Sequence, residues 1–472
     1  MAVTGATTRH EGWSSKTAFV LAAIGSAVGL GNLWRFPAEA GTNGGGAFVL
    51  FYIGCVVLIG LPILLAETLI GRHGQAAAPE SYRKVAEQSG ASNRWEWVAG
   101  LGVLSAFLVL SFYCVVGGWV LYYIWIFLAD LFSTGLFGTA FQGIPAAEIE
   151  GLFPAMIGNG GLTVALDAVF LFATLYFVIR GVTGGIEITA TWLMPAFFLL
   201  LIGITIYGAF GGAFGEAFTY LFTFEPEKLT GPVMLAAVGQ AFFSLSLGVA
   251  GMVTYGSYVG RDVNLGQTSG IIAAADTSVA LIAGLCIFPI VFAAGLAASA
   301  GPGLMFQTLP HAFQAMPFGS LIGLAFFIMV AFAALTSSVA LLEVPTAWVK
   351  EKFRVSRMLS AILVASGAFV LGALSALSTG ALADFHPLDF VPLFAGLGFF
   401  DVLDTLTSKL TMPITALLTA VFVGWIADRR LTDAENGLSG PVHLLWRFLI
   451  CWLCPLALAA ILVVGIFPSL TA

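Results

Sequence analysis

Charged residues are scarce in this sequence: Asp, Glu, Lys and Arg make up 9% of its 472 residues, whereas 59% are hydrophobic. The mean hydropathy is +0.99. This composition is more hydrophobic than a water-soluble protein requires. Several apolar stretches of about 20 residues are long enough to span a bilayer. Long basic runs are also missing and the formal net charge is −7, which argues against nucleic acid as a partner. The composition therefore indicates a protein whose solvent is the lipid bilayer.

The residue patterns of an enzyme are missing as well. The sequence has no paired nucleophile and base, no His/Cys cluster with metal-ligand spacing and no phosphate-binding loop. Its five histidines fall in tails, loops or the ends of apolar segments. Its five cysteines all fall in apolar segments and are expected to pack as small hydrophobic side chains: Cys55, Cys114, Cys286, Cys451 and Cys454. We therefore expect a protein without enzymatic activity.

Eleven apolar runs predict an all-α membrane protein with eleven transmembrane helices. The expected spans are 17–38, 46–72, 97–128, 162–180, 187–211, 233–258, 267–297, 319–349, 357–378, 398–426 and 444–468. If the N-terminus is cytoplasmic, 15 of the 18 Lys and Arg residues lie on the inside, and only Arg35, Lys228 and Lys409 fall elsewhere. The positive-inside rule therefore predicts a multi-pass protein of the inner (plasma) membrane with a cytoplasmic N-terminus and an external C-terminus.

Two of the predicted helices contain stretches that do not suit a helix in lipid. Gly25 to Asn32 (GSAVGLGN) holds three glycines, a serine and an asparagine, and Gln240 to Gly251 (QAFFSLSLGVAG) is punctuated by serines and glycines. A helix that breaks inside the bilayer frees carbonyls for a small cation and amides for an anion. The alternative is that the small residues only let neighbouring helices pack closely. Because interrupted helices in corresponding positions of two halves mark a transporter binding site, the pair favours a transporter.

The order of the segments predicts two halves of five helices each, 17–211 and 233–426, followed by an extra helix at 444–468. An odd number of helices in each half makes the second half start from the opposite side of the membrane, as inverted repeats require. The two interrupted helices are then the first of each half. We expect the whole chain, 1–472, to form a single transmembrane transporter domain.

Ionisable residues inside the predicted spans are candidates for function. Glu67 is expected to accept hydrogen bonds from amides that the broken helices free, since unpaired buried groups are costly. Arg35 and Asp404 suggest an ion pair that gates the external side of the site. The hydroxyls of residues 336–338 either bond to carbonyls of their own helix or supply oxygen ligands to a small cation, and sequence physics leaves both alternatives open.

Four motifs resemble the neurotransmitter:sodium symporters, and most closely their bacterial amino-acid transporters. The motifs are GSAVGLGNLWRFP at 25–37, NGGGAF at 43–48, QAFFSLS at 240–246 and LTSS at 335–338. The likeness runs from about residue 13 to residue 425. It implies the leucine-transporter fold, with interrupted helices 1 and 6, and transport that is driven by sodium.

The resemblance also implies roles for individual residues. The substrate would be bound by Ala27, Leu30, Gly31, Val109, Tyr113, Phe243, Ser244, Ser246, Val249, Ser337 and Leu341. One sodium ion would be bound by Ala27, Asn32, Ser244 and Asp276, and a second by Gly25, Val28, Ala333, Thr336 and Ser337. The outer gate would be Arg35 with Asp404, and the cytoplasmic side would be closed by Trp13, Tyr258 and Glu351. The family's arginine three residues before that tryptophan is His10 in this sequence.

The expected function is the sodium-coupled import of hydrophobic amino acids, aliphatic or aromatic, by alternating access and without chloride. Position 29 is glycine, where relatives that carry monoamines have an aspartate. Asp276 would supply the negative charge that chloride supplies in animal relatives, and Ala280 lacks the hydroxyl that chloride would need. The alternative is a carrier of another small amine or osmolyte. An ion channel is disfavoured, because the sequence shows no pore-lining repeat.

Overall fold

The computed structural model describes residues 11–136, 138–298 and 303–466, and the regular elements in these ranges are all helices. Nine continuous runs of helix in the described ranges are long and apolar enough to cross a membrane, and a bent pair makes ten. The nine runs are formed by α3 (Gly46–Cys55) with α4 (Leu61–Gly74), α6 (Glu96–Thr134), α8 (Gly160–Val178), α9 (Glu187–Ala209), α13 (Leu265–Ala293), α15 (Gly319–Phe353), α16 (Arg357–Ser378), α17 (Phe399–Thr405) with α18 (Met412–Val421), and α20 (Gly440–Phe448) with α21 (Cys454–Ile466).

The first interrupted helix breaks where its glycines predict a break. Helix α1 (Lys16–Ala27) ends at Val28, whose backbone is extended with φ −72° and ψ 110°. Helix resumes at Gly31 as a short π-helical turn and continues as α2 (Phe36–Thr42), bent by 47° from α1. The expected span 17–38 is therefore two half-helices that together reach further, to residue 42.

The second interrupted helix is α11 (Gly231–Ser244) followed by α12 (Gly251–Ser257). The chain between them is unwound, and Ser246, Gly248 and Ala250 have positive φ angles of 51°, 79° and 56°. Only glycine adopts such angles without strain. With these two interrupted helices beside the nine continuous runs, each of the eleven predicted segments has a helical counterpart in the described ranges.

Where an observed helix differs from its predicted span, it is in most cases longer than predicted. Helix α6 continues to Thr134 instead of 128, and α15 continues to Phe353 instead of 349, because helical hydrogen bonding does not end where the apolar stretch ends. Shorter helices lie in the connections: α5 (Ala78–Gln88), α7 (Ala146–Gly158), α10 (Phe214–Phe222), α14 (Leu309–Gln314) and α19 (Arg429–Glu435).

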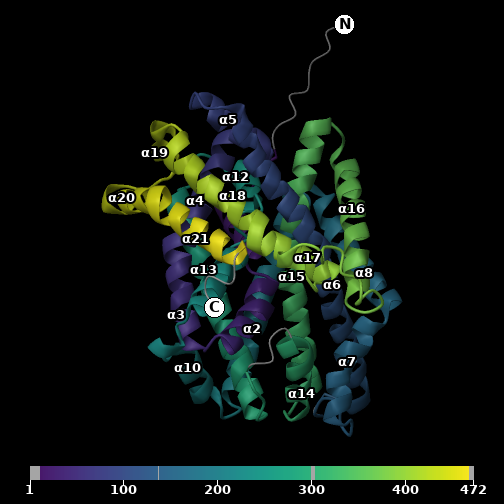
Figure 1. Ribbon diagram of the computed structural model, residues 1–472. Helices are drawn as coiled ribbons and strands as arrows, with labels where there is room; N and C mark the ends of the chain where they lie inside the picture. The colour runs from purple at the N-terminus through teal and green to yellow at the C-terminus, as the bar shows by residue number, and fades with distance from the viewer. Residues whose placement is uncertain (1–10, 137, 299–302, 467–472) are drawn as a thin grey trace.

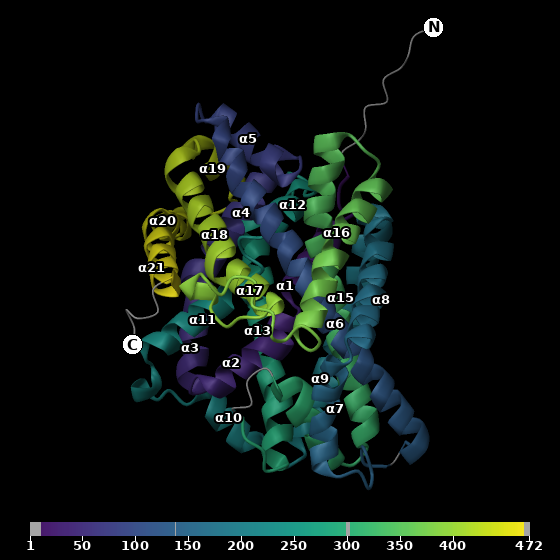
Figure 2. The same cartoon turned by 45° about the vertical axis from the view of Figure 1, so that its right-hand side comes forward.

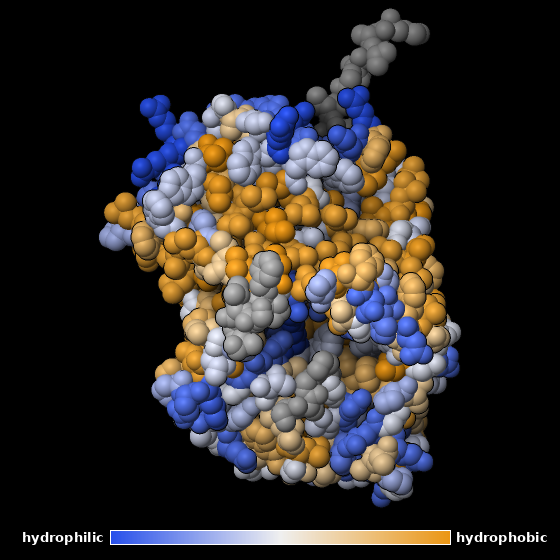
Figure 3. Space-filling view, in the orientation of Figure 1, coloured by the Kyte–Doolittle hydropathy of each residue, from blue (hydrophilic) through white to orange (hydrophobic). Residues whose placement is uncertain are grey.

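The helices form a bundle whose two ends differ. Figures 1 and 2 show α5, α12 and α19 at one end and α7, α10 and α14 at the other. The first end carries Arg72, Arg83, Lys84 and the basic residues that follow α15, and we call it the basic end. Figure 3 shows a hydrophobic belt across the middle of the molecule, between more hydrophilic ends. The protein is therefore a multi-pass membrane protein.

Half-helix α1 is packed inside the bundle against α9, α13 and α15. Half-helix α12 packs against α4, and there the Glu67 carboxylate accepts a hydrogen bond of 2.9 Å from the amide of Gly248. Glu67 is fully buried. It holds the unwound segment in place, which agrees with the structural role expected for it.

Gly248 provides a test of this unwound segment. At its φ of 79° an alanine is strained by about 1–2 kcal/mol, and its Cβ would also overlap the carbonyl oxygen of Met412. We expect Gly248→Ala to lower the thermal stability of the purified protein markedly. Gly239→Ala, in the regular part of α11 where nothing lies within 4 Å of an added Cβ, is the matched control. Equal melting temperatures for the two variants would contradict the strain argument.

Candidate functional site

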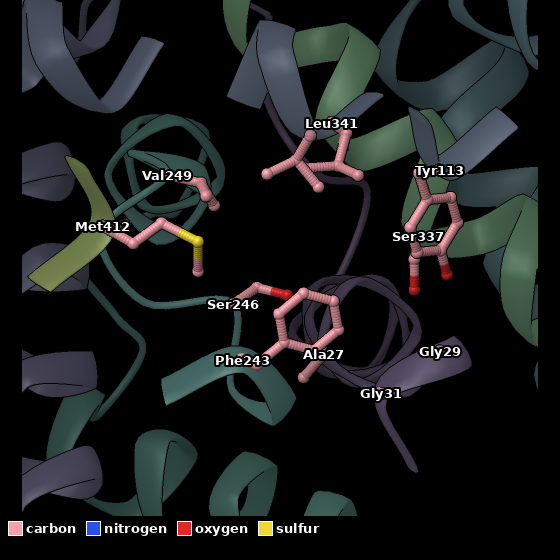
Figure 4. A pocket seen from close by; sticks show the side chains of 11 residues that line it. Ala27, Gly29, Gly31, Tyr113, Phe243, Ser246, Val249, Ser337, Leu341 and Met412 are labelled. Atoms are coloured by element: carbon pink, nitrogen blue, oxygen red, sulfur yellow. The ribbon is translucent and has the colours of Figure 1, made fainter. Parts of the chain in front are cut away.

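A small cavity lies between the two helix breaks. Its volume is about 30 Å³, room for roughly two water molecules. Figure 4 shows the side chains that surround it. The cavity is lined by Ala27, Gly29, Gly31, Val109, Tyr113, Phe243, Ser246, Val249, Ser337, Leu341 and Met412. The structure thus brings together all the expected substrate residues except Leu30 and Ser244, which adjoin the cavity, and none of the lining side chains is charged.

The start of the second half-helix faces a tyrosine hydroxyl. The amide of Leu30 donates a hydrogen bond of 3.2 Å to the Tyr113 hydroxyl oxygen. A Cβ on Gly29 would lie 2.5 Å from Ser337 Oγ and 2.7 Å from that hydroxyl oxygen, so a side chain at position 29 would require Ser337 and Tyr113 to shift. Backbone amides at a helix start together with a hydroxyl form a suitable site for a carboxylate.

Asn32, Ser244 and Asp276 form a buried polar cluster beside the cavity. The Asn32 amide nitrogen donates to Asp276 Oδ1 over 2.8 Å and to Ser244 Oγ over 3.0 Å, and the Ser244 hydroxyl donates to Asp276 Oδ2 over 2.7 Å. The Asn32 side-chain oxygen accepts from the Gly29 amide at 3.0 Å. These are hard oxygen ligands of the kind a small cation binds. A cation bound through the Asn32 oxygen requires this amide to turn over.

A second set of oxygens lies where α15 crosses the break in α1. The Ser337 hydroxyl donates to the carbonyl of Gly25 over 3.2 Å and to that of Val28 over 3.1 Å. The Thr336 hydroxyl donates to the Ala333 carbonyl over 3.0 Å. The helix break has freed the α1 carbonyls, so the five groups expected at the second sodium site converge. The hydroxyls of Thr336 and Ser338 bond to carbonyls of their own helix, whereas that of Ser337 bonds to carbonyls of the first interrupted helix. That these hydroxyls bind a small cation stays a prediction.

Phe243 separates the cavity from a larger vestibule on the side away from the basic end. The vestibule has a volume of about 430 Å³ and includes Trp34, Phe112, Trp119 and Phe400 among its walls. The Arg35 guanidinium lies 4.5 Å from the centre of the Phe243 ring. It also lies 3.8 Å from Asp404 and 3.8 Å from Glu39. The expected pair of Arg35 and Asp404 is therefore close, with Glu39 as a further partner.

At the basic end, Trp13 closes the other side of the bundle. Its indole nitrogen donates to the Tyr255 carbonyl over 3.1 Å, and its backbone amide donates to the Tyr258 carbonyl over 3.2 Å. The rings of Trp13 and Tyr255 meet edge to face, 5.2 Å apart. The segment before α1 is thus attached directly to α12.

Glu11 connects the same segment to α15 and α16. Its carboxylate lies 2.7 Å from Lys350 Nζ and 2.9 Å from Arg357 Nη1. Arg357 also pairs with the buried Glu343, which accepts a hydrogen bond of 2.7 Å from the Tyr258 hydroxyl. Burial alone would raise the pKa of Glu11, but the charges of Arg357 and Lys350 outweigh it and hold that pKa below its ordinary value.

The structure places Glu351 outside this network. Its carboxylate accepts a hydrogen bond of 2.8 Å from the amide of Ala77, so it fixes the connection between α4 and α5. His10 lies outside the described residues. Sequence reasoning did not find Glu11, Lys350 and Arg357 as a closing network, nor Met412 as a lining residue, because no motif distinguishes a surface charge or a helical methionine from its neighbours.

The sequence matches the profile of the sodium:neurotransmitter symporter family over residues 10–133 and 154–470. The chain belongs to this family. It is 37% identical over 459 residues to the uncharacterized sodium-dependent transporter YhdH of Bacillus subtilis, covering 94% of this chain and 95% of that protein. It is 32% identical to an uncharacterized sodium-dependent transporter of Haemophilus influenzae, covering 97% and 99% of the two chains.

Among solved structures, the protein is similar to MhsT in complex with L-phenylalanine. The TM-score is 0.87 with 39% sequence identity, and the match covers 97% of this chain and 100% of that one. The protein therefore has the leucine-transporter fold, with two inverted five-helix repeats. It is a sodium-dependent transporter and not an enzyme.

The closing network at the basic end is tested by Glu11→Gln, which removes both ion pairs. We expect hydrogen exchange of residues 11–20 to rise up to about fivefold at neutral pH, because partly exposed ion pairs contribute at most about 1 kcal/mol. The wild type should approach the variant as pH falls through the lowered pKa of Glu11, since the ion pairs exist only above it. Glu80→Gln, which removes a local pair with Arg83 at the same end, is the control. Unchanged exchange in Glu11→Gln would exclude a closing role.

Proposed function

We propose that this protein is a sodium-coupled symporter that imports hydrophobic amino acids by alternating access. The glycine at position 29 carries the proposal, because it supplies no carboxylate to the site. The carboxylate that meets the Leu30 and Gly31 amides and the Tyr113 hydroxyl therefore has to come with the substrate. The substrate amino group then meets the carbonyls of Ala27 and Phe243, which lie at the ends of half-helices α1 and α11.

The uncharged lining supports a hydrophobic side chain on the substrate. A charged side chain would be buried here without a partner, which is expensive. The L-phenylalanine in the complex with MhsT has a hydrophobic side chain of this kind. Since the cavity measures only about 30 Å³, such a substrate needs its walls to move. Met412 has an unbranched, adaptable side chain that suits this task.

Two sodium ions are proposed to travel with the substrate. One would bind Asn32, Ser244, Asp276 and the Ala27 carbonyl, and would share the substrate carboxylate as a ligand. The other would bind the Gly25, Val28 and Ala333 carbonyls with Thr336 and Ser337, and would join α1 to α15. Because the first ion and the substrate share ligands, each lowers the free energy of binding the other. The inward sodium gradient then drives uptake.

Alternating access follows from closures on both sides of the same cavity. We propose that the basic end is cytoplasmic, as the positive-inside rule indicates, and that the C-terminus is external. The outer gate is Phe243 under Arg35 with Asp404. The inner closure is Trp13 on Tyr258, strengthened by Glu11. The whole chain, 1–472, works as one transporter unit in this scheme.

The substrate class is tested by competition binding in sodium. L-phenylalanine should displace radiolabelled L-phenylalanine, whereas phenethylamine, its decarboxylated form, should bind at least about 100-fold more weakly. The loss corresponds to about two hydrogen bonds to a charged group, at about 1.5 kcal/mol each. Equal displacement by the two compounds would instead support the alternative, a carrier of another small amine or osmolyte.

Chloride independence is a second testable part of the proposal. The donors that animal relatives would direct at chloride are engaged here: the Gln240 amide nitrogen bonds to the Gly31 carbonyl at 2.7 Å, and the Ser244 hydroxyl bonds to Asp276 at 2.7 Å. Uptake should be unchanged when gluconate replaces chloride. The double variant Asp276→Asn with Ala280→Ser should become chloride-dependent. A wild type that stops without chloride would refute the assignment of Asp276.

A further inference from the structure

Asp167 is a buried carboxyl that the transport scheme does not use. It lies in the N-terminal half of α8, within a proposed membrane span, and it is completely buried. Neither of its side-chain oxygens has a hydrogen-bond partner among the described residues. Asp276 differs, because its carboxylate accepts hydrogen bonds from Asn32 and Ser244.

Two glycines make the space that Asp167 occupies. A Cβ on Gly118 of α6 would lie 2.9 Å from the Asp167 backbone nitrogen. A Cβ on Gly372 of α16 would lie 2.8 Å from Asp167 Oδ2 and 2.9 Å from the carbonyl oxygen of Ser111. The carboxyl therefore lies where α6, α8 and α16 meet, and Figure 2 shows these helices running beside one another.

The charged form of Asp167 has nothing to stabilise it at this junction. An ionised carboxylate in a low-dielectric interior is costly unless it is paired, and the described residues give Asp167 no basic partner. Cys114 of α6 is the titratable group that acts on it from the facing helices, and it supplies no positive charge. A neutral carboxylic acid, by contrast, carries an O–H that donates to a carbonyl oxygen.

We propose that Asp167 is a permanently protonated positioning residue whose O–H donates to the Ser111 carbonyl and fixes the back of α6. With 3.6 residues per turn, Ser111, Cys114 and Gly118 share the face of α6 that meets α8. Val109 and Tyr113 lie on the opposite face, where they line the substrate cavity. The junction thus sets the position of the Tyr113 hydroxyl from behind. This role rests on the proposed substrate site.

The protonation state is tested without any substrate. Infrared spectra of the purified protein at neutral pH, wild type minus Asp167→Asn, should contain the C=O band of a protonated carboxylic acid. A difference spectrum with carboxylate bands alone would overturn the proposal. Because this readout needs no transport, its result is independent of whether the proposed function is correct.

The positioning role is tested by sodium-dependent binding of L-phenylalanine. Asp167→Asn keeps a neutral donor and should retain the affinity within about twofold. Asp167→Leu removes the donor and should weaken binding about fivefold, the loss of about one hydrogen bond. Thr163→Val is the matched control, because Thr163 is buried one turn away on α8 and, within the described part of the chain, its hydroxyl bonds to the carbonyls of Asn159 and Gly160 at the start of α8. It should leave the affinity unchanged.

Three results would contradict the proposal for Asp167. If Asp167→Asn loses binding while Asp167→Glu keeps it, a neutral amide donor does not replace the carboxyl group, and positioning through a simple neutral donor is wrong. If Asp167→Leu binds as the wild type does, Asp167 does not position α6. If Thr163→Val weakens binding as much as Asp167→Leu, any loosening of α8 has the same effect and the specific bond to Ser111 is excluded.

Discussion

The structure depends on one constraint: backbone groups freed by a helix break inside an apolar core need partners. Two helices stop near the middle of the bundle, and side chains from other helices bond to the freed groups. Glu67 accepts from Gly248, Tyr113 accepts from Leu30, and Ser337 donates to Gly25. These hydrogen bonds replace the helical hydrogen bonds that are lost at the two breaks, so the breaks cost little free energy. The same groups are the ones that a carboxylate and small cations would use, so the fold and the site have a common origin.

Three fully buried carboxylic acids have different roles, and the groups that surround each acid determine its role. Glu67 accepts from backbone amides and serves the fold, whereas Asp276 accepts from two side chains beside the cavity and is proposed to bind a cation. Among the described residues Asp167 has no hydrogen-bond partner, and it is proposed to hold a proton instead. All three lie in helices that cross the apolar belt. The hydrogen-bond partners on neighbouring helices therefore determine the role of each acid, whereas its depth in the membrane does not.

The sequence allowed the eleven segments, the positions of both breaks and most lining residues to be predicted. Glycine, serine and asparagine within an apolar run are strong local signals, and the motifs of the family specify their roles. Contacts between distant charged residues leave no such signal. The ion pair of Glu11 with Arg357 forms because the segment before α1 lies beside the start of α16. Glu351 bonds to Ala77 and does not join the closing network. The small volume of the cavity depends on side-chain packing across five helices, which no periodicity encodes.

The amino acid and a sodium ion are proposed to complete one another's binding site between the two breaks. The most direct measurement is reciprocal linkage: the dissociation constant of L-phenylalanine over a range of sodium concentrations, with choline as the replacement ion, and the sodium dependence of binding over a range of L-phenylalanine. Each ligand should lower the dissociation constant of the other by the same factor. A phenylalanine affinity that is the same with and without sodium would contradict it.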